Sequence, residues 1–145
     1  MQRATLPVQP GGLQLQGMPP TVLLVDDEPM VCQVTCRMLQ EAGYTCEGVY
    51  SARAALGFLE ARRPYHLFVL DIRLPDMSGL TLAHLIAVQY PSTPFLFISG
   101  YPQSRGEGLP SSPWAFLPKP FSSEQLLGAV RQLLPQEPTT PSRAL

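Results

Sequence analysis

The sequence predicts a doubly wound α/β fold, in which helices cover both faces of a parallel sheet. Two observations predict it. The candidate strands are short, continuous apolar runs, which are typical of strands buried on both faces. Segments with helical periodicity separate these runs, as parallel strands require. The 145 residues fit one domain over 21–134, and we predict flexible segments at 1–20 and 135–145, where proline is frequent and periodicity is absent.

The first half of this domain predicts a βαβαβ unit. Thr21–Val25 is a short, β-branched apolar run and predicts the first strand. Pro29 suits the first turn of the helix that follows, and Gly43 ends that helix. The unit is completed by a strand over 45–49, a helix over 51–61 with Ser51 as its N-cap, and a strand over 67–70.

The second half continues the alternation of helices and strands. Its predicted elements are a helix with Leu82, Leu85, Ile86 and Gln89 on one side, strands over 94–98 and 115–117, and a last helix that opens with the capping-box pair Ser122 and Gln125. The segment 102–113 contains three prolines, two glycines and little apolar periodicity. We therefore predict that a fourth helix, located there between the last two strands, is short or irregular.

Charged or polar residues follow four of the predicted strands. They are Asp26 and Asp27 after the first strand, Asp71 after the third, Ser99 after the fourth and Lys119 after the fifth. Because the carboxyl ends of parallel strands meet at one edge of the sheet, we expect these side chains to lie together. Three carboxylates repel one another unless positive charge lies among them, and Lys119 supplies one such charge. Oxygen donors without histidine or sulfur favour a hard cation, Mg²⁺ or alternatively Mn²⁺.

This set of residues suits phosphoryl transfer. A carboxylate can attack phosphorus, and the reaction is catalysed mainly by positioning and by stabilising charge on the transferring oxygens. We predict that Asp71 is the nucleophile and accepts the phosphoryl group. Lys119 and the metal would take charge from phosphoryl oxygens, and the Ser99 hydroxyl would donate a hydrogen bond to another. No general base is needed, because Asp71 is already ionised.

Four runs of this chain resemble the receiver domain of two-component response regulators, over Thr21 to Leu134. The runs are VLLVDDEP at 22–29, DIRLPDMSG at 71–79, ISG at 98–100 and FLPKPF at 116–121. The resemblance implies a flavodoxin-like sheet with strand order 2-1-3-4-5. It implies that Asp71 takes a phosphoryl group from a phosphohistidine on a histidine kinase or a histidine phosphotransfer domain. It also implies that Asp26, Asp27, Asp71 and the backbone carbonyl of Arg73 hold Mg²⁺.

The same resemblance implies a conformational switch. Ser99 would be drawn toward the phosphoryl group, and the ring of Phe116 would turn into the vacated space. The Lys119–Pro120 peptide bond is expected to be cis, and Arg73 and Tyr101 are expected to tune how fast water removes the phosphoryl group. The chain resembles in particular the terminal receivers of hybrid sensor histidine kinases, and a receiver is a self-modifying switch, not an enzyme acting on other molecules.

Other interpretations of these residues remain open at this stage. Asp26 and Asp27 could cap a helix, and Phe116 could be an ordinary core residue. The chain could be a pseudo-receiver that only binds proteins. It could also be an aspartate-nucleophile phosphatase, although such enzymes usually carry a second acid two residues after the nucleophile, where this chain has Arg73. A nucleotide-binding Rossmann domain is excluded, because no glycine-rich loop follows the first strand.

Composition limits the partners and the location. A net charge of −1 gives no basic field for nucleic acid or an anionic membrane, so we expect neither as a partner. No apolar run approaches the ~20 residues that span a bilayer and no secretory signal is recognisable, which favours the cytoplasm. Cys32, Cys36 and Cys46 show no metal-ligand spacing and are interpreted as reduced thiols. We interpret His66 and His84 as structural or surface residues.

Overall fold

A parallel sheet forms the centre of the molecule, which we describe from a computed structural model over residues 19–100 and 109–134. The strands are β2 (Thr21–Val25), β3 (Thr45–Val49), β4 (Leu67–Asp71), β5 (Phe95–Ser99) and β6 (Trp114–Pro118). They form one 5-stranded sheet in the order β3-β2-β4-β5-β6, and every neighbouring pair is parallel. Counted in chain order this is 2-1-3-4-5, so the predicted topology is confirmed.

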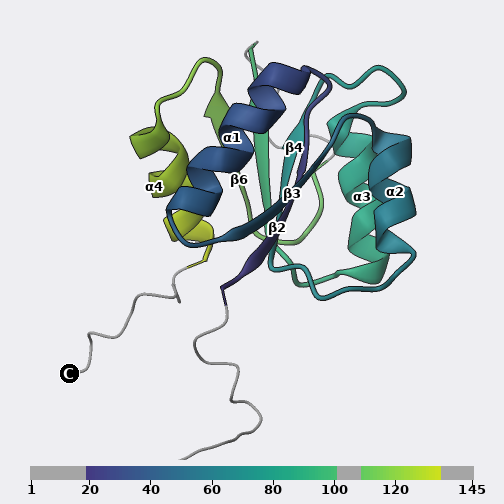
Figure 1. The fold of residues 1–145 in the computed structure, drawn as a ribbon. Helices are drawn as coiled ribbons and strands as arrows, with labels where there is room; N and C mark the ends of the chain where they lie inside the picture. The colour runs from purple at the N-terminus through teal and green to yellow at the C-terminus, as the bar shows by residue number, and fades with distance from the viewer. Residues whose placement is uncertain (1–18, 101–108, 135–145) are drawn as a thin grey trace, which may run out of the picture.

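Helices cover both faces of the sheet, as predicted. They are α1 (Pro29–Glu41), α2 (Ala52–Leu59), α3 (Gly79–Gln89) and α4 (Ser123–Leu133). α1 and α4 lie on one face, whereas α2 and α3 lie on the other (Figure 1). None of the helices within the two described ranges has the length and hydropathy that a membrane span requires.

The two faces of the sheet bury two separate apolar cores, because successive side chains of a strand point to opposite faces. In β2, Leu23 and Val25 pack with α2 and α3, whereas Val22 and Leu24 pack with α1 and α4. All four side chains are fully buried. This explains why β2 reads as a continuous apolar run and not as an alternating one.

The helix starts follow local signals that the sequence carries. Pro29 is the first residue of α1. Ser51 caps α2 by accepting a hydrogen bond from the N–H of Ala54, 3.0 Å away. In the capping box of α4, Gln125 N–H donates to Ser122 Oγ at 3.0 Å and Ser122 N–H donates to Gln125 Oε1 at 2.9 Å. These predictions are confirmed.

Some predicted boundaries are wrong. α2 ends at Leu59, two residues before the predicted end at Ala61, because the N–H groups of Glu60 and Ala61 donate to carbonyls three residues back, which is the tighter 3₁₀ pattern. β4 runs one residue beyond its predicted end and includes Asp71. Of the predicted irregular segment 102–113, the part up to 108 lies outside the described residues, as do 1–18 and 135–145. Residues 109–113 contain no helix.

Candidate functional site

A cavity of about 580 Å³ opens at the carboxyl ends of the strands. Its lining consists of Asp27, Glu28, Asp71, Arg73, Leu74, Pro75, Gly100 and Lys119. These residues come from the end of β4 and from the loops after β2, β4, β5 and β6, which are far apart in the sequence. The edge of the sheet at which the sequence predicts a site is therefore hollow and lined mainly by charged groups.

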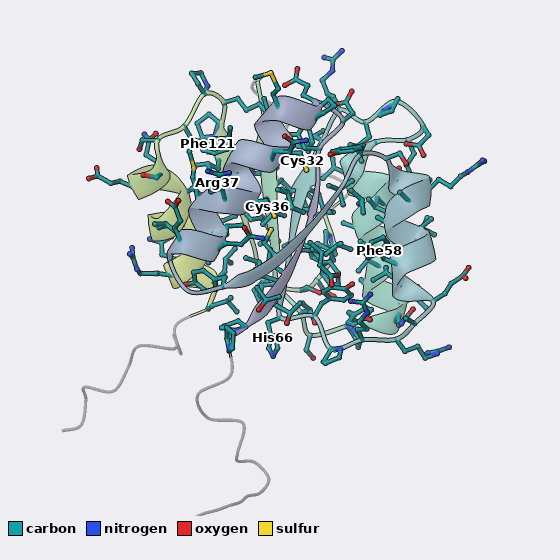
Figure 2. All side chains as sticks on the ribbon, in the orientation of Figure 1. Cys32, Cys36, Arg37, Phe58, His66 and Phe121 are labelled. Atoms are coloured by element: carbon teal, nitrogen blue, oxygen red, sulfur yellow. The ribbon has the colours of Figure 1, made fainter. Side chains whose placement is uncertain are left out.

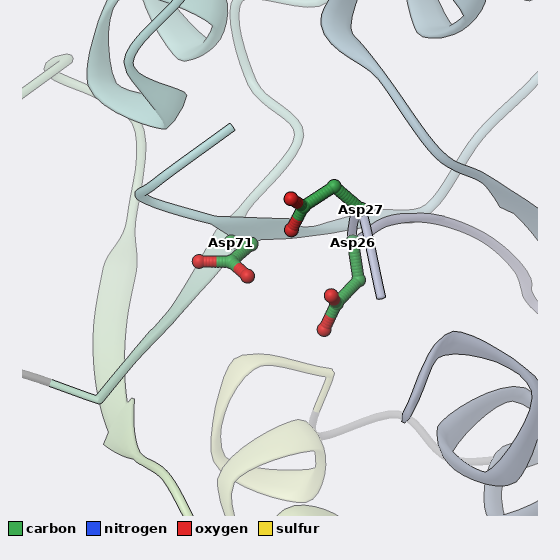
Figure 3. A group of neighbouring side chains, drawn as sticks. All are labelled: Asp26, Asp27 and Asp71. Carbon is green, nitrogen blue, oxygen red and sulfur yellow. The ribbon is translucent and has the colours of Figure 1, made fainter. Parts of the chain in front are cut away.

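Three carboxylates gather at this edge. Asp26 and Asp27 directly follow β2, and Asp71 is the last residue of β4. β2 and β4 are neighbours, and the pairing of Val25 with Leu70 brings the residues that follow side by side. One carboxylate oxygen from each acid lies within 4.8 Å of the others (Figure 3). Asp26 and Asp71 are buried and Asp27 is exposed, so the group has a closed and an open side.

Backbone hydrogen bonds fix the two buried acids in the same way. Asp26 Oδ1 accepts from the N–H of Glu28 at 3.0 Å, and Asp71 Oδ1 accepts from the N–H of Arg73 at 3.0 Å. Each acid thus forms a local turn with the residue two positions on. The Oδ2 atoms of both acids then face the amine of Lys119.

Lys119 is the cation among these acids. Its Nζ donates to Asp71 Oδ2 at 2.9 Å and lies 3.3 Å from Asp26 Oδ2. Burial lowers the pKa of Lys119, but the hydrogen bond to Asp71 and the negative charges of Asp26 and Asp71 raise it by a larger amount. The net shift of this pKa is therefore upward. Lys119 therefore carries its charge at neutral pH.

One ammonium does not balance three carboxylates. Burial raises the pKa of Asp26, and the negative charge of Asp71 adds to this, although the N–H of Glu28 and the charge of Lys119 lower it. Asp26 Oδ2 is buried and accepts no hydrogen bond, because the ion pair with Lys119 lacks the geometry of one. A buried carboxylate oxygen that accepts no hydrogen bond is costly. A divalent cation bound beside it would offset this cost.

The donor set fits a hard divalent cation. Asp26, Asp27 and Asp71 offer carboxylate oxygens only, and Asp27 is on the exposed side, where a cation could keep several waters. Within the two described ranges, no other group of three or more acid, cysteine or histidine side chains has such spacing. The N–H of Arg73 donates to Asp71 Oδ1. The backbone carbonyl of Arg73 remains a predicted ligand of the cation.

Ser99 and Phe116 lie on the neighbouring strands β5 and β6. Ser99 ends β5, is buried, and its backbone carbonyl accepts from the N–H of Lys119 at 2.9 Å. Phe116 is half-buried and its ring lies 5.5 Å from the ring of Phe97 and 5.4 Å from that of Trp114. Beside Ser99, an added Cβ on Gly100 would meet no atom within 4 Å, so the cavity is open at this point.

Other expectations can be compared with the structure directly. The Lys119–Pro120 bond is cis, as expected from the resemblance. His66 lies at the amino ends of the strands (Figure 2) and is exposed, and its Nδ1 accepts from the N–H of Thr21 at 2.9 Å, in line with the prediction of a structural or surface residue. The predicted tuning residue Tyr101 lies outside the described residues.

The cysteines are free thiols, as predicted. Cys32 and Cys36 lie one turn apart on α1 (Figure 2), and the Cys36 thiol donates to the carbonyl of Cys46 at 3.3 Å. Burial raises the pKa of Cys32 to about 12 and also raises that of Cys46. Thiols that hold their protons so firmly are poor nucleophiles and poor metal ligands.

The structure adds three residues that the sequence reasoning missed. Glu28 extends toward Lys119, with 3.7 Å between Oε1 and Nζ. Asp76 caps α2 from the β4–α3 loop, by accepting from the N–H groups of Ala52 and Arg53. Gly79 packs against the backbone of Asp71. All three lie in the runs that carry the resemblance, which is the one signal that could have drawn attention to them.

The comparisons with known proteins agree with this geometry. The family model described as response regulator receiver domain matches residues 22–131. The chain is 37% identical over 120 residues to the sensor kinase CckA of Brucella abortus, which covers 81% of this chain but 13% of that kinase. It is 33% identical over 120 residues to the probable transcriptional regulatory protein TcrX of Mycobacterium tuberculosis, which covers 81% of this chain and 51% of TcrX.

Solved structures show the same fold. The receiver domain of the hybrid histidine kinase CckA has a TM-score of 0.68 at 30% identity, and covers 79% of this chain and 98% of that domain. The chemotaxis protein CheY4 of Vibrio cholerae has a TM-score of 0.72 at 26% identity, with the same two coverages. The chain spans about half or less of the two relatives named above, CckA and TcrX. On the family match, the shared fold and these identities, the chain belongs to the response regulator receiver domain family of two-component signalling.

Proposed function

We propose that Asp71 accepts a phosphoryl group from a phosphohistidine on a histidine kinase or a histidine phosphotransfer domain, and that Asp26, Asp27, Asp71 and the carbonyl of Arg73 hold Mg²⁺. The observation that carries this proposal is the 2.9 Å hydrogen bond from Lys119 Nζ to Asp71 Oδ2 at the wall of an open cavity. A buried carboxylate that faces both an ammonium and open space can be reached by a donor and has its reaction partners already placed.

The residues of this chain have separate tasks in the proposed reaction. Asp71 Oδ1 accepts from the Arg73 N–H and Oδ2 accepts from Lys119 Nζ, and we assign the attack on phosphorus to Oδ2, the oxygen that faces Lys119. The P–N bond of the donor breaks, its electron pair goes to the imidazole nitrogen, which takes a proton from water, and an acyl phosphate forms on Asp71. Bound Mg²⁺ supplies positive charge against the phosphoryl oxygens. Lys119 stabilises a second phosphoryl oxygen, and the Ser99 hydroxyl donates to a third.

The switch that we propose lies at Ser99 and Phe116. Ser99 would move toward the phosphoryl group, and the half-buried ring of Phe116 would turn inward. Phe116 has no hydroxyl to satisfy when buried, so its inward position leaves no polar group without a partner. A small electrostatic change at Asp71 would thus alter the surface around β6.

The wider setting is also a proposal. We propose that the receiver occupies 21–134, that it lies in the cytoplasm, and that it is the receiver of a hybrid histidine kinase. The matches to the CckA kinase and to the receiver of a hybrid kinase support the last point. Receiver domains are signalling switches in general, and we assign this chain neither activity on other phosphate esters nor contact with nucleic acid or membrane.

The test is incubation with phosphoramidate and Mg²⁺, followed by intact mass measurement. We expect one phosphoryl addition, which a chelator abolishes and which Asp71→Asn removes. Lys119→Ala should slow it strongly while the protein stays folded. Phosphorylation that persists in the Asp71 variant would refute the proposal, and steady release of phosphate from an ester substrate would favour a phosphatase instead.

A further inference from the structure

Glu28 stands at the mouth of the cavity and is not used in the reaction described above. Its side chain is 62% exposed, and Oε1 lies 3.7 Å from Lys119 Nζ. The residue is the N-cap of α1, yet its side chain makes no capping hydrogen bond. The structural work of Glu28 is done by its backbone, whose N–H donates to Asp26 and whose carbonyl accepts from Cys32. Apart from its ion pair with Lys119, the carboxylate of Glu28 therefore has no structural role in these contacts, and it can act on what enters the cavity.

The side chains around Asp71 carry more negative than positive charge. The cavity is lined by Asp27, Glu28 and Asp71 on the acidic side and by Arg73 and Lys119 on the basic side, with the buried Asp26 directly behind. A divalent cation would bring this set to about neutral. Without Glu28 the same loaded site would carry a net positive charge, which is what an incoming phosphate anion prefers.

Resting on the function proposed above, we infer that Glu28 is a specificity-determining residue, which slows phosphorylation of Asp71 by free anionic phosphodonors. The negative charge of Glu28 repels a donor that diffuses into the cavity alone. A phosphohistidine presented by a docked protein has binding free energy that offsets this repulsion, whereas a small donor has none.

The expected size follows from Coulomb's law. At a separation of about 7 Å in a water-filled cavity, one unit of charge on Glu28 changes the rate by roughly threefold for each unit of charge on the donor. The effect should weaken at high salt, because Glu28 is exposed and its charge is screened. A change in packing caused by the substitution would not depend on the charge of the donor or on salt, so this dependence distinguishes the two causes.

The experiment compares the wild type and Glu28→Gln as acceptors from two phosphodonors. Phosphoramidate is singly charged near neutral pH, and acetyl phosphate is doubly charged. The initial rate of phosphoryl addition is followed by intact mass at saturating Mg²⁺, at low and at high salt. Glu28→Lys provides a second variant with a larger charge change. Glu41→Gln is the matched control, since it removes the same charge from the other end of α1.

We expect Glu28→Gln to be faster than wild type by roughly threefold with phosphoramidate and roughly tenfold with acetyl phosphate at low salt, and expect both gains to shrink at high salt. Glu28→Lys should gain roughly tenfold with the singly charged donor, and Glu41→Gln should match the wild type. Equal rates in wild type and Glu28→Gln, or an equal gain with both donors, would overturn the inference while leaving the proposed function intact. If the wild type accepts no phosphoryl group from either donor, the proposed function fails and the inference with it.

Discussion

Gly79 lies directly against the backbone of Asp71: a Cβ atom at position 79 would overlap the carbonyl oxygen of Asp71. The N–H of Gly79 also donates to the carbonyl of Ile72 at 2.7 Å. The start of α3 is thereby fixed onto the end of β4. The position of the proposed phosphoryl acceptor thus depends on a residue without a side chain, eight positions further on.

Gly79→Ala should therefore destabilise the domain. The added methyl group cannot be accommodated without moving backbone, so we expect a loss of about 1–3 kcal/mol in the free energy of unfolding. Denaturant titration measures this, and the phosphorylation rate should fall as well. Gly57→Ala in α2 is the matched control: its Cβ would meet nothing within 4 Å, and alanine should stabilise that helix by up to about 1 kcal/mol. Equal stability of the two variants would show that the contact with Asp71 is unimportant.

Asp76→Ala should weaken the start of α2. Asp76 Oδ1 accepts from Ala52 N–H at 3.1 Å and Oδ2 accepts from Arg53 N–H at 2.9 Å. The loss of this exposed cap should cost about 1 kcal/mol in the free energy of unfolding at neutral pH. Urea titration of wild type and variant measures it.

The cost of Asp76→Ala should also depend on pH. The pKa of Asp76 lies below its ordinary value of 3.8, chiefly because of the hydrogen bond from Arg53 N–H. A carboxylate with a lowered pKa stabilises the fold above pH 3.8, and this contribution is lost as the pH falls through its folded value. Ser51→Ala, which removes the uncharged cap of the same helix, should cost a similar amount at every pH. If the loss in the free energy of unfolding had the same pH dependence in both variants, this account would be contradicted.

Asp26→Asn should stabilise the metal-free protein, by about 1–2 kcal/mol, because it removes a buried charge. The pKa of Asp26 is raised above 3.8, mainly by burial. The folded wild type therefore takes up a proton before the unfolded chain does, and its stability should rise as the pH falls through the folded pKa of Asp26.

Mg²⁺ should reverse the order of stability of the wild type and Asp26→Asn. The wild type gains stability from the bound ion by linkage, whereas Asp26→Asn has lost a proposed ligand and gains less. Thermal unfolding with and without Mg²⁺ measures both effects. If Asp26→Asn were less stable than the wild type in the presence of a chelator, the buried charge would not be the cost that we infer.

Trp114 should report the proposed motion of Phe116. It is the only tryptophan of the chain, and its ring meets that of Phe116 edge-on at 5.4 Å. We expect phosphorylation, or beryllofluoride with Mg²⁺, to change the fluorescence of Trp114. Phe116→Leu should remove most of this change and leave the extent of phosphorylation as in the wild type. A full fluorescence response in that variant would mean that Phe116 is an ordinary core residue.

The fold could be predicted from the sequence because burial on both faces makes each central strand a continuous apolar run. β2 and β5 are examples, since each contains four fully buried apolar residues. The end of β4 was missed because Asp71 is a polar residue that continues the pairing with β5, opposite Ile98. Hydrophobic periodicity identifies apolar residues only, so it does not indicate that a carboxylate at the end of an apolar run is still part of the strand.

The site could be predicted because parallel strands deliver their ends to one edge, whatever their separation in the sequence. Asp26, Asp71 and Lys119 meet for this reason. The contacts of Asp76 with α2 and of Gly79 with Asp71 depend on how the β4–α3 loop folds back. Spacing along the chain does not contain that information. Glu28 reads in sequence like any exposed acid at the start of a helix, and its distance to Lys119 is what distinguishes it.

The central claim is that Asp71 itself carries the phosphoryl group, and chemical trapping tests it most directly. The protein is phosphorylated with phosphoramidate and Mg²⁺ and then reduced with borohydride, which converts an aspartyl phosphate into homoserine. Peptide mass spectrometry should find homoserine at position 71 and at no other aspartate. Homoserine at Asp26 or Asp27, or a phosphoryl group that resists borohydride because it is held by a hydroxyl such as that of Ser99, would contradict the account.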